Sequence, residues 1–162
     1  MKIVTNLVFL SLIAFGAIMS PQSLSGAPAR DAAATFNDVG GKEWLLLEVK
    51  SAGKTITLDR QKLSIDNFIG AFSLSFQEDR VSGMGAPNRY FAPYSFGANR
   101  SLSIGQVAST MMMAFREPDD LKEKEFFDYL SKVKRWDLWQ GKLELYSTNN
   151  NGSDVILVFV LK

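Results

Sequence analysis

Residues 155–161 read Val-Ile-Leu-Val-Phe-Val-Leu, an unbroken apolar run near the end of the chain. Because successive side chains of a strand point to opposite faces, a run that is apolar throughout predicts a strand covered on both sides. Asn149-Asn150-Asn151-Gly152 stands shortly before this run and is typical of a hairpin turn. The stretch therefore predicts a central strand in an antiparallel sheet, with a partner strand just upstream.

The sequence before this turn continues the strand pattern. Leu143 and Leu145 alternate with polar neighbours, which is the period of a half-buried strand. Further strands are predicted at residues 44–49, 56–58, 63–65, 72–76, 90–96, 102–104 and 107–115, with hairpin turns at 59–62 and 77–80. About eight short strands, most of them joined by hairpins, predict an antiparallel sheet closed into a barrel or nearly so.

One helix interrupts the strands. Pro118 suits the first helical position, and Asp119, Asp120 and Glu123 would place negative charge in the first turn. Four apolar residues then recur at helical spacing and would form one buried face: Phe126, Tyr129, Leu130 and Val133. The fold class predicted from the pattern is mostly β with one α-helix packed across a barrel-like sheet.

The first residues have the order of a secretory signal peptide. Lys2 precedes the apolar run 7–19, and Ala27-Pro28-Ala29 supplies a cleavage signal of small residues. We expect a signal peptide at residues 1–29, a flexible leader at 30–41 and one domain at 42–162. An uncleaved membrane anchor is the main alternative. The mature chain is expected to be periplasmic or secreted, and not to span a membrane.

Composition excludes several classes of function. The 162 residues are 46% hydrophobic and 22% charged, with a net charge of +1, so no basic surface for nucleic acid is indicated. The sequence holds no Cys and no His. This excludes disulfides, zinc sites built on Cys or His, Cys–His nucleophiles and Ser–His–Asp triads. No cofactor and no metal is predicted.

The middle of the chain carries a family resemblance. Residues 82–94 form a glycine-containing turn that leads to Asn88-Arg89-Tyr90, and Thr110-Met111-Met112 follows. A helix and a Leu-x-Leu strand at residues 143–145 come next. This order resembles the META domain family, which includes exported heat-shock proteins of the HslJ type. The resemblance covers roughly residues 41–160.

The resemblance implies an exported, β-rich, barrel-like domain with one helix, similar to proteins linked to envelope stress. Many members carry a Cys before the motif Asn and another after Thr-x-Met; here Ala86-Pro87 and residues 113–115 stand at those places, so any property of that pair is in doubt. The family has no established catalytic residues to carry over. The motif residues, interpreted as structural, are Gly83, Gly85, Asn88, Tyr90, Tyr94, Thr110 and Met112.

Several segments admit a functional and a structural interpretation. The turn at residues 83–88 could cradle an anion with backbone N–H groups, but a tight structural loop is favoured. Residues 149–154 could suggest a calcium loop, but a hairpin turn is favoured. Residues 111–113 could line a ligand pocket, although core filling is commoner. An aromatic surface for a partner or glycan is weighed almost evenly against core packing for Tyr90, Phe91, Tyr94, Trp136 and Trp139.

Three hypotheses of function follow. The first is a non-enzymatic interaction or stress-related domain of the cell envelope, with an unidentified envelope protein as partner. The second is a carrier or sensor of a small apolar ligand held within the barrel, which requires an interior cavity. The third, ranked well behind, is a carboxylate-based enzyme, which requires two carboxylates facing each other in a cleft.

Overall fold

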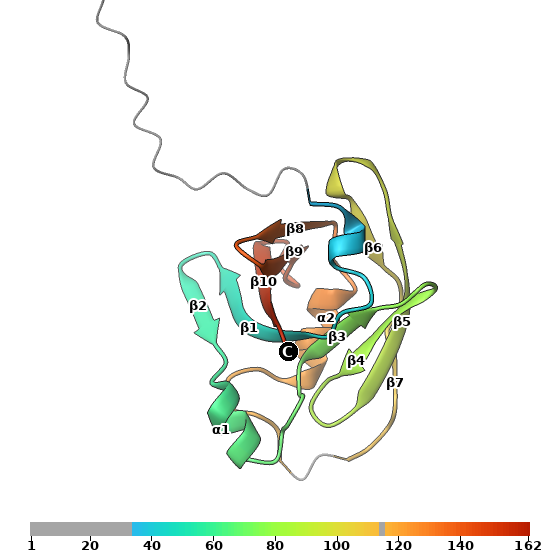
Figure 1. Cartoon of the computed structure of the whole chain (residues 1–162). Helices are drawn as coiled ribbons and strands as arrows, with labels where there is room; N and C mark the ends of the chain where they lie inside the picture. Colours follow the sequence, from blue (N-terminus) through green and yellow to red (C-terminus); the bar gives the residue numbers. More distant parts are fainter. Residues whose placement is uncertain (1–33, 114–115) are drawn as a thin grey trace, which may run out of the picture.

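The computed structural model describes residues 34–113 and 116–162, and shows a strongly bent antiparallel sheet with two α-helices (Figure 1). The predicted signal peptide and residues 30–33 lie outside these ranges. Within them, no helix is long and apolar enough to cross a membrane. The strands are β1 (Trp44–Ser51), β2 (Lys54–Thr57), β3 (Ser73–Phe76), β4 (Arg80–Met84), β5 (Arg89–Phe96), β6 (Leu102–Ile104), β7 (Ala108–Ser109), β8 (Arg135–Trp139), β9 (Lys142–Thr148) and β10 (Asp154–Leu161).

The sheet forms a nearly closed barrel. Its strands follow the order β6-β5-β4-β3-β1-β10-β9-β8, while β2 pairs with β1 and β7 pairs with β5. The two ends of this order meet at a short seam, where Ser101 forms an isolated bridge with Arg135. The backbone N–H of Leu102 also donates to the carbonyl of Lys134 at 3.1 Å. The predicted antiparallel, barrel-like architecture is thus confirmed, with ten strands in the described residues rather than about eight.

Strand β10 is central, as its apolar sequence predicts. It pairs with β1 on one side, from Trp44 opposite Leu161 to Ser51 opposite Val155, and with β9 on the other. The Asn-rich segment joins β9 to β10 as the predicted turn, and the Asn149 side-chain oxygen accepts hydrogen bonds from the backbone N–H groups of Asn151 and Ser153.

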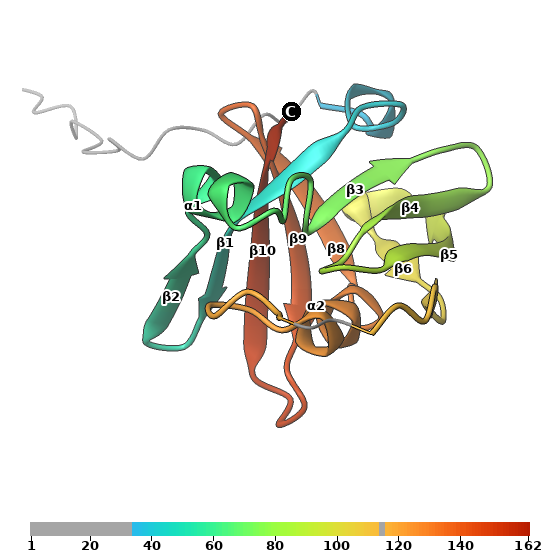
Figure 2. The ribbon, with the colours of Figure 1, turned by 90° about the horizontal axis from the view of Figure 1, so that it is seen from below.

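Large apolar side chains fill the interior. The largest fully buried ones include Trp44, Phe72, Phe76, Phe126 and Phe159. Helix α2 (Glu123–Leu130) lies across one end of the barrel (Figure 2), where the Phe126 ring packs against Phe72 at 5.3 Å between centroids. Burying an aromatic side chain removes about 150–250 Å² of its surface from water. Helix α2 therefore contributes the Phe126 ring to the core and also covers one end of the barrel.

Helix α2 begins later than predicted, at Glu123 instead of Pro118. The residues just before the helix make tertiary contacts instead. Pro118 and Leu121 are buried, and the Lys62 ammonium group lies 3.4 Å from a carboxylate oxygen of Asp119. A helix starting at Pro118 would draw these residues away from their partners.

The predicted turn at residues 59–62 and strand at 63–65 are wrong, because this segment forms helix α1 (Arg60–Ile65). Asp59 caps it: one carboxylate oxygen accepts hydrogen bonds from the backbone N–H groups of Gln61 and Lys62 at 2.9 and 3.0 Å. Leu63 is the buried residue of this short helix. An Asp at the N-cap satisfies N–H groups that a strand would have paired, which is why the local sequence favours the helix.

The predicted strand 107–115 is also wrong for most of its length, because β7 holds only Ala108 and Ser109. Residues 114–115 lie outside the described ranges. We call residues 110–113 the methionine strap. Its methionines do not fill the core: the side chains of Met111, Met112 and Met113 are 97%, 62% and 93% exposed.

Candidate functional site

The motif residues meet in one hydrogen-bond network around Asn88, which is only 6% exposed. The Asn88 side-chain oxygen accepts from the Thr110 hydroxyl at 2.8 Å and from the Met112 backbone N–H at 2.7 Å. Its amide nitrogen donates to the Glu123 carboxylate at 2.7 Å and to the Met112 carbonyl at 3.3 Å. One buried side chain therefore ties β5, the methionine strap and the start of α2 together. We call this network the Asn88 clamp.

The glycine turn does form a cradle of backbone N–H groups, and the chain fills it with its own carboxylate. One oxygen of Glu123 accepts from the N–H groups of Ala86 and Asn88, each at 2.7 Å. A Cβ on Gly85 would stand 2.4 Å from that same oxygen, so glycine leaves the space that the carboxylate occupies. In this structure the backbone N–H groups of the turn are thus occupied by a carboxylate of the same chain.

The remaining motif residues also have structural partners. Gly83 on β4 faces Tyr90 on β5, and the Tyr90 hydroxyl donates to the Ser73 carbonyl at 2.8 Å. Complete burial raises the pKa of Tyr90, so this hydroxyl stays protonated as a donor. The Tyr94 hydroxyl donates to the Gln77 carbonyl at 2.6 Å. Desolvation raises the pKa of Tyr94, with a smaller contribution from Asp79.

The predicted motif residues do not include Glu123, the fourth member of the clamp. The sequence does place Glu123 in the first turn of the predicted helix, where its charge is interpreted as a contact with the helix dipole. No sequence pattern shows that this carboxylate reaches back to a turn more than thirty residues earlier.

The sequence profile of the META domain, compared with this chain, matches residues 37–159. The chain belongs to the META domain family. That match includes all members of the Asn88 clamp and most of the central strand β10, so the clamp lies within the family region. A search among curated proteins gave no match.

Two solved structures share the fold of this META domain. An NMR structure of a protein from Burkholderia xenovorans has a TM-score of 0.62 at 21% identity, covering 88% of this chain and 97% of that one. A crystal structure of a DUF4847 family protein from Bacteroides vulgatus ATCC 8482 has a TM-score of 0.52 at 11% identity, covering 78% of this chain and 96% of that one. Identities this low establish a common architecture only.

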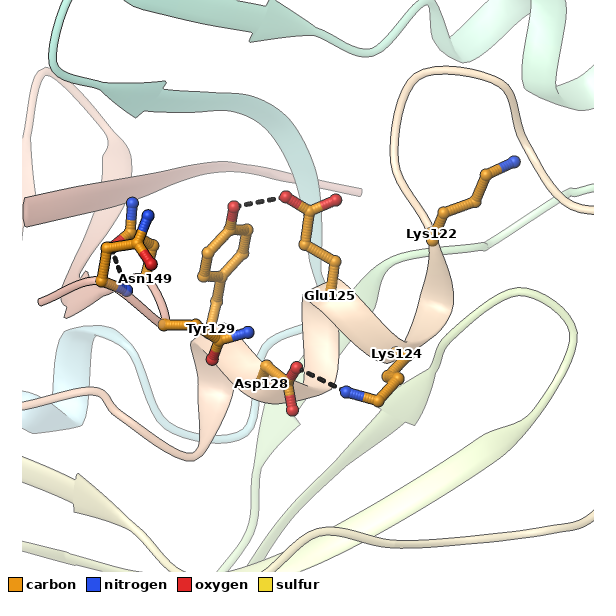
Figure 3. A pocket seen from close by; sticks show the side chains of 8 residues that line it. Lys122, Lys124, Glu125, Asp128, Tyr129 and Asn149 are labelled. Atoms are coloured by element: carbon orange, nitrogen blue, oxygen red, sulfur yellow. Dashed lines mark hydrogen bonds and ion pairs between the residues drawn. The ribbon is translucent and has the colours of Figure 1, made fainter. Parts of the chain in front are cut away.

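Four surface hollows of the META domain are candidates for binding. One, of about 530 Å³, lies between α2 and the β9–β10 turn (Figure 3). A second, of about 560 Å³, follows β3, β4 and β5, and a third, of about 10 Å³, lies beside α1. The fourth lies beside the 3₁₀ helix η1 (Phe36–Asp38) and is described below. These four do not supply the interior cavity that a carrier of apolar ligands requires.

The polar groups of the hollow beside α2 are bonded to one another. The Tyr129 hydroxyl donates to Glu125 at 2.5 Å, and Lys124 pairs with Asp128 at 3.0 Å (Figure 3). Burial and the hydrogen bond to Glu125 raise the pKa of Tyr129, so its hydroxyl stays neutral near neutral pH. In this arrangement the Tyr129 hydroxyl is a hydrogen-bond donor to Glu125.

Two carboxylates do face each other, but they do not line any of the four hollows. Asp137 on β8 stands opposite Glu144 on β9, and the two are 2% and 5% exposed. Asp137 forms ion pairs with Arg100 and Arg135, while Glu144 accepts the Tyr146 hydroxyl at 2.6 Å. None of the four hollows therefore supplies, for this pair, the cleft that glycosidase chemistry requires.

A metal site would require several ligating side chains close together. In residues 34–113 and 116–162, no three His, Cys, Asp or Glu side chains gather as potential ligands. The oxygen-rich turn at residues 149–154 uses Asn149 to bond its own backbone, which is the hairpin role that the sequence favours.

The hollow beside η1 has a floor of aromatic rings, and we call it the aromatic hollow; its volume is about 370 Å³. Phe36 stacks on Phe96 with 4.3 Å between centroids and an interplanar angle of 15°. Phe36 also meets Phe76 edge-to-face at 5.1 Å, and Tyr94 at 5.7 Å. One face of Phe96 is thus covered by Phe36, yet 56% of Phe96 is exposed, so part of this residue remains accessible to a partner.

The predicted aromatic surface is only partly realised. Tyr90 and Trp136 are buried in the core, Tyr94 and Trp139 are half-buried, and Phe91 is 50% exposed on β5. The aromatic hollow instead uses Phe36, Phe76 and Phe96, which sequence reasoning did not select. Phe96 ends the strand 90–96 on the same alternating face as the buried Tyr90 and Ala92, so alternation alone predicts burial and does not reveal its exposure.

Proposed function

We propose that this chain is an exported, non-enzymatic interaction domain of the cell envelope that binds a partner protein through the aromatic hollow. The META family supports a domain of the envelope type, and the family is not known for catalysis. The signal-peptide pattern at residues 1–29 supports export. The exposure of Phe96, an aromatic residue that lines the hollow, is the observation that carries the proposal.

The aromatic hollow has the anatomy of a protein-binding hot spot. Its apolar floor is bordered by exposed polar side chains of Asn37, Gln77 and Glu78. Interfaces commonly combine a desolvated aromatic centre with a polar rim, and a few central residues carry most of the binding energy. A volume of about 370 Å³ suits one or two large side chains inserted by the partner.

We expect the Phe96→Ser substitution to weaken partner binding about tenfold or more, the effect of losing a central anchor worth at least roughly 2 kcal/mol. A photo-reactive amino acid at Glu78, on the rim, would capture the partner in intact cells. The loss of binding is measured by comparing the yield of the crosslinked band from the Phe96→Ser variant with the yield from the chain that keeps Phe96.

The matched control is Phe91→Ser. Phe91 lies on the same strand and is 50% exposed, but it lines the hollow along β3, β4 and β5 instead. The band should persist in this control, and thermal unfolding should show that both variants remain folded. Equal yields for Phe96→Ser and Phe91→Ser, or no band at all from Glu78, would contradict the proposal.

Export predicts a shortened chain. When the protein is expressed with its own leader in its host, we expect the intact mass of the envelope fraction to correspond to residues 30–162, because the cleavage signal ends at Ala29. A mass that includes residues 1–29, with the protein in the membrane fraction, would favour a retained anchor. Recovery of the whole chain from the cytoplasm would contradict export.

A further inference from the structure

The methionine strap presents soft ligand atoms to solvent. Methionine is an apolar residue that is usually buried, yet Met111 and Met113 are 97% and 93% exposed. The sequence has no Cys and no His, so thioethers are the only soft metal ligands that its side chains offer. Of its six methionines, three are consecutive in this strap.

The Asn88 clamp fixes the backbone at the middle of the strap. The side-chain amide of Asn88 accepts from the N–H of Met112 and donates to the carbonyl of the same residue. Both backbone groups of Met112 therefore point to one side, as they do in a strand. The strap also continues the pairing of β7, since the Thr110 N–H donates to the Arg89 carbonyl at 3.0 Å.

An extended backbone at Met112 places its two neighbours on a common side. Side chains at i and i+2 of a strand share a face, with Cα atoms about 7 Å apart. Methionine has three rotatable side-chain bonds, so two thioethers at this spacing can converge on one ion between them. By the same alternation, the side chain of Met112 is expected on the opposite side.

We propose that the thioethers of Met111 and Met113 together bind one Cu(I) ion. Thioether sulfur is a soft, neutral donor that favours Cu(I) over Zn(II) or Cu(II), whose usual ligands include imidazole and thiolate. A thioether carries no proton to lose, so affinity should not change between pH 5 and pH 8, unlike that of thiolate or imidazole sites. Ag(I), which is equally soft, should bind the same pair.

This site is independent of the proposed partner surface. The strap is bonded to the start of α2 through the Asn88 clamp, at one end of the barrel, whereas η1 lies at the other end (Figure 2). The aromatic hollow is lined by residues of η1. Failure of one proposal therefore leaves the other standing, and a chain with leucines at 111 and 113 keeps both the hollow and an apolar strap.

The test is a Cu(I) competition titration of the purified chain against a chromogenic Cu(I) chelator, under anaerobic reducing conditions. We expect one Cu(I) per chain, at least a tenfold loss of affinity in Met111→Leu/Met113→Leu, and the same affinity at pH 5 and pH 8. Met84→Leu is the control, because Met84 is half-buried on β4. The Met111→Leu and Met113→Leu exchanges lie at exposed positions and should leave the temperature of thermal unfolding unchanged.

A second measurement reads the ligands directly. In ¹³C-methyl NMR of labelled methionines, Ag(I) should shift the methyl signals of Met111 and Met113 and leave that of Met84 in place. Equal Cu(I) affinity in the double variant and the unchanged chain would overturn the proposal. So would binding that disappears at pH 5, or an Ag(I) shift that is absent at both strap methionines.

Discussion

Replacement of Asn88 by Ala should lower the free energy of unfolding by about 3 kcal/mol, because buried polar groups left without partners each cost roughly 1–3 kcal/mol. The substitution removes both the accepting oxygen and the donating nitrogen of the side-chain amide. The Thr110 hydroxyl, the Met112 N–H and one oxygen of Glu123 all lose a partner at 2.7–2.8 Å. Urea unfolding, followed by tryptophan fluorescence, measures the change.

The matched control for this substitution is Asn151→Ala, because Asn151 is exposed in the β9–β10 turn and its side chain makes none of the hydrogen bonds described for that turn. We expect a change within about 0.5 kcal/mol for this variant. If Asn88→Ala were equally mild, the clamp would not stabilise the fold. Glu123→Gln provides a second check and should also destabilise the fold. In either orientation its amide NH2 would face a donor, which is the Asn88 side-chain nitrogen or the backbone N–H groups of Ala86 and Asn88.

Gly83→Ala should destabilise the protein by at least about 3 kcal/mol, since overpacking a filled interior costs 1–3 kcal/mol and occasionally more. A Cβ at Gly83 would stand 2.0 Å from the Ser73 carbonyl oxygen and 3.0 Å from the Tyr90 hydroxyl. The first contact is with backbone and cannot be relieved by a side-chain rotation. Relief would require β3 and β4 to separate, which would also break the hydrogen bond from Tyr90 to Ser73.

Gly40→Ala is the corresponding control. A Cβ at Gly40 would meet its nearest atom, the Phe36 carbonyl oxygen, at 3.6 Å, which is ordinary van der Waals contact. This variant should unfold at nearly the same urea concentration as the unchanged chain. A Gly83→Ala protein with an unchanged midpoint would show that the strands at this point can move apart without cost.

The sequence predicted those features of the fold that depend on alternation and apolar runs. The central position of β10 follows from seven consecutive apolar residues, and the turn before it from Asn149 and Gly152. The helix α1 was missed because its six residues are too few to display a period, and only the cap at Asp59 distinguishes it from a turn. The methionine strap was misread because residue type favours burial, whereas its exposure is set by the tertiary clamp.

The sequence could predict three residues of the candidate site, but not the contacts that bring them together with the fourth. Asn88, Thr110 and Met112 stand in the family motif, and the structure brings them together. Their fourth partner, Glu123, joins through a contact across 35 positions of sequence, which no local pattern encodes. The aromatic hollow depends likewise on η1 lying against β5, a packing that the composition of residues 30–41 does not indicate.

The pairing of β1 with β10 also sets the order in which this chain can fold. Lys162 reaches Glu43 across 119 positions of sequence, and Trp44 pairs with Leu161. Until residues 154–161 have been synthesised, the strand partners that the described part of the chain offers β1 are β2 and, over two residues, β3. Contacts so distant in sequence are slow to form, so the hairpins β4–β5 and β9–β10 should precede the closing step. An incomplete chain would meanwhile expose the apolar face of β1, which is a surface that invites aggregation.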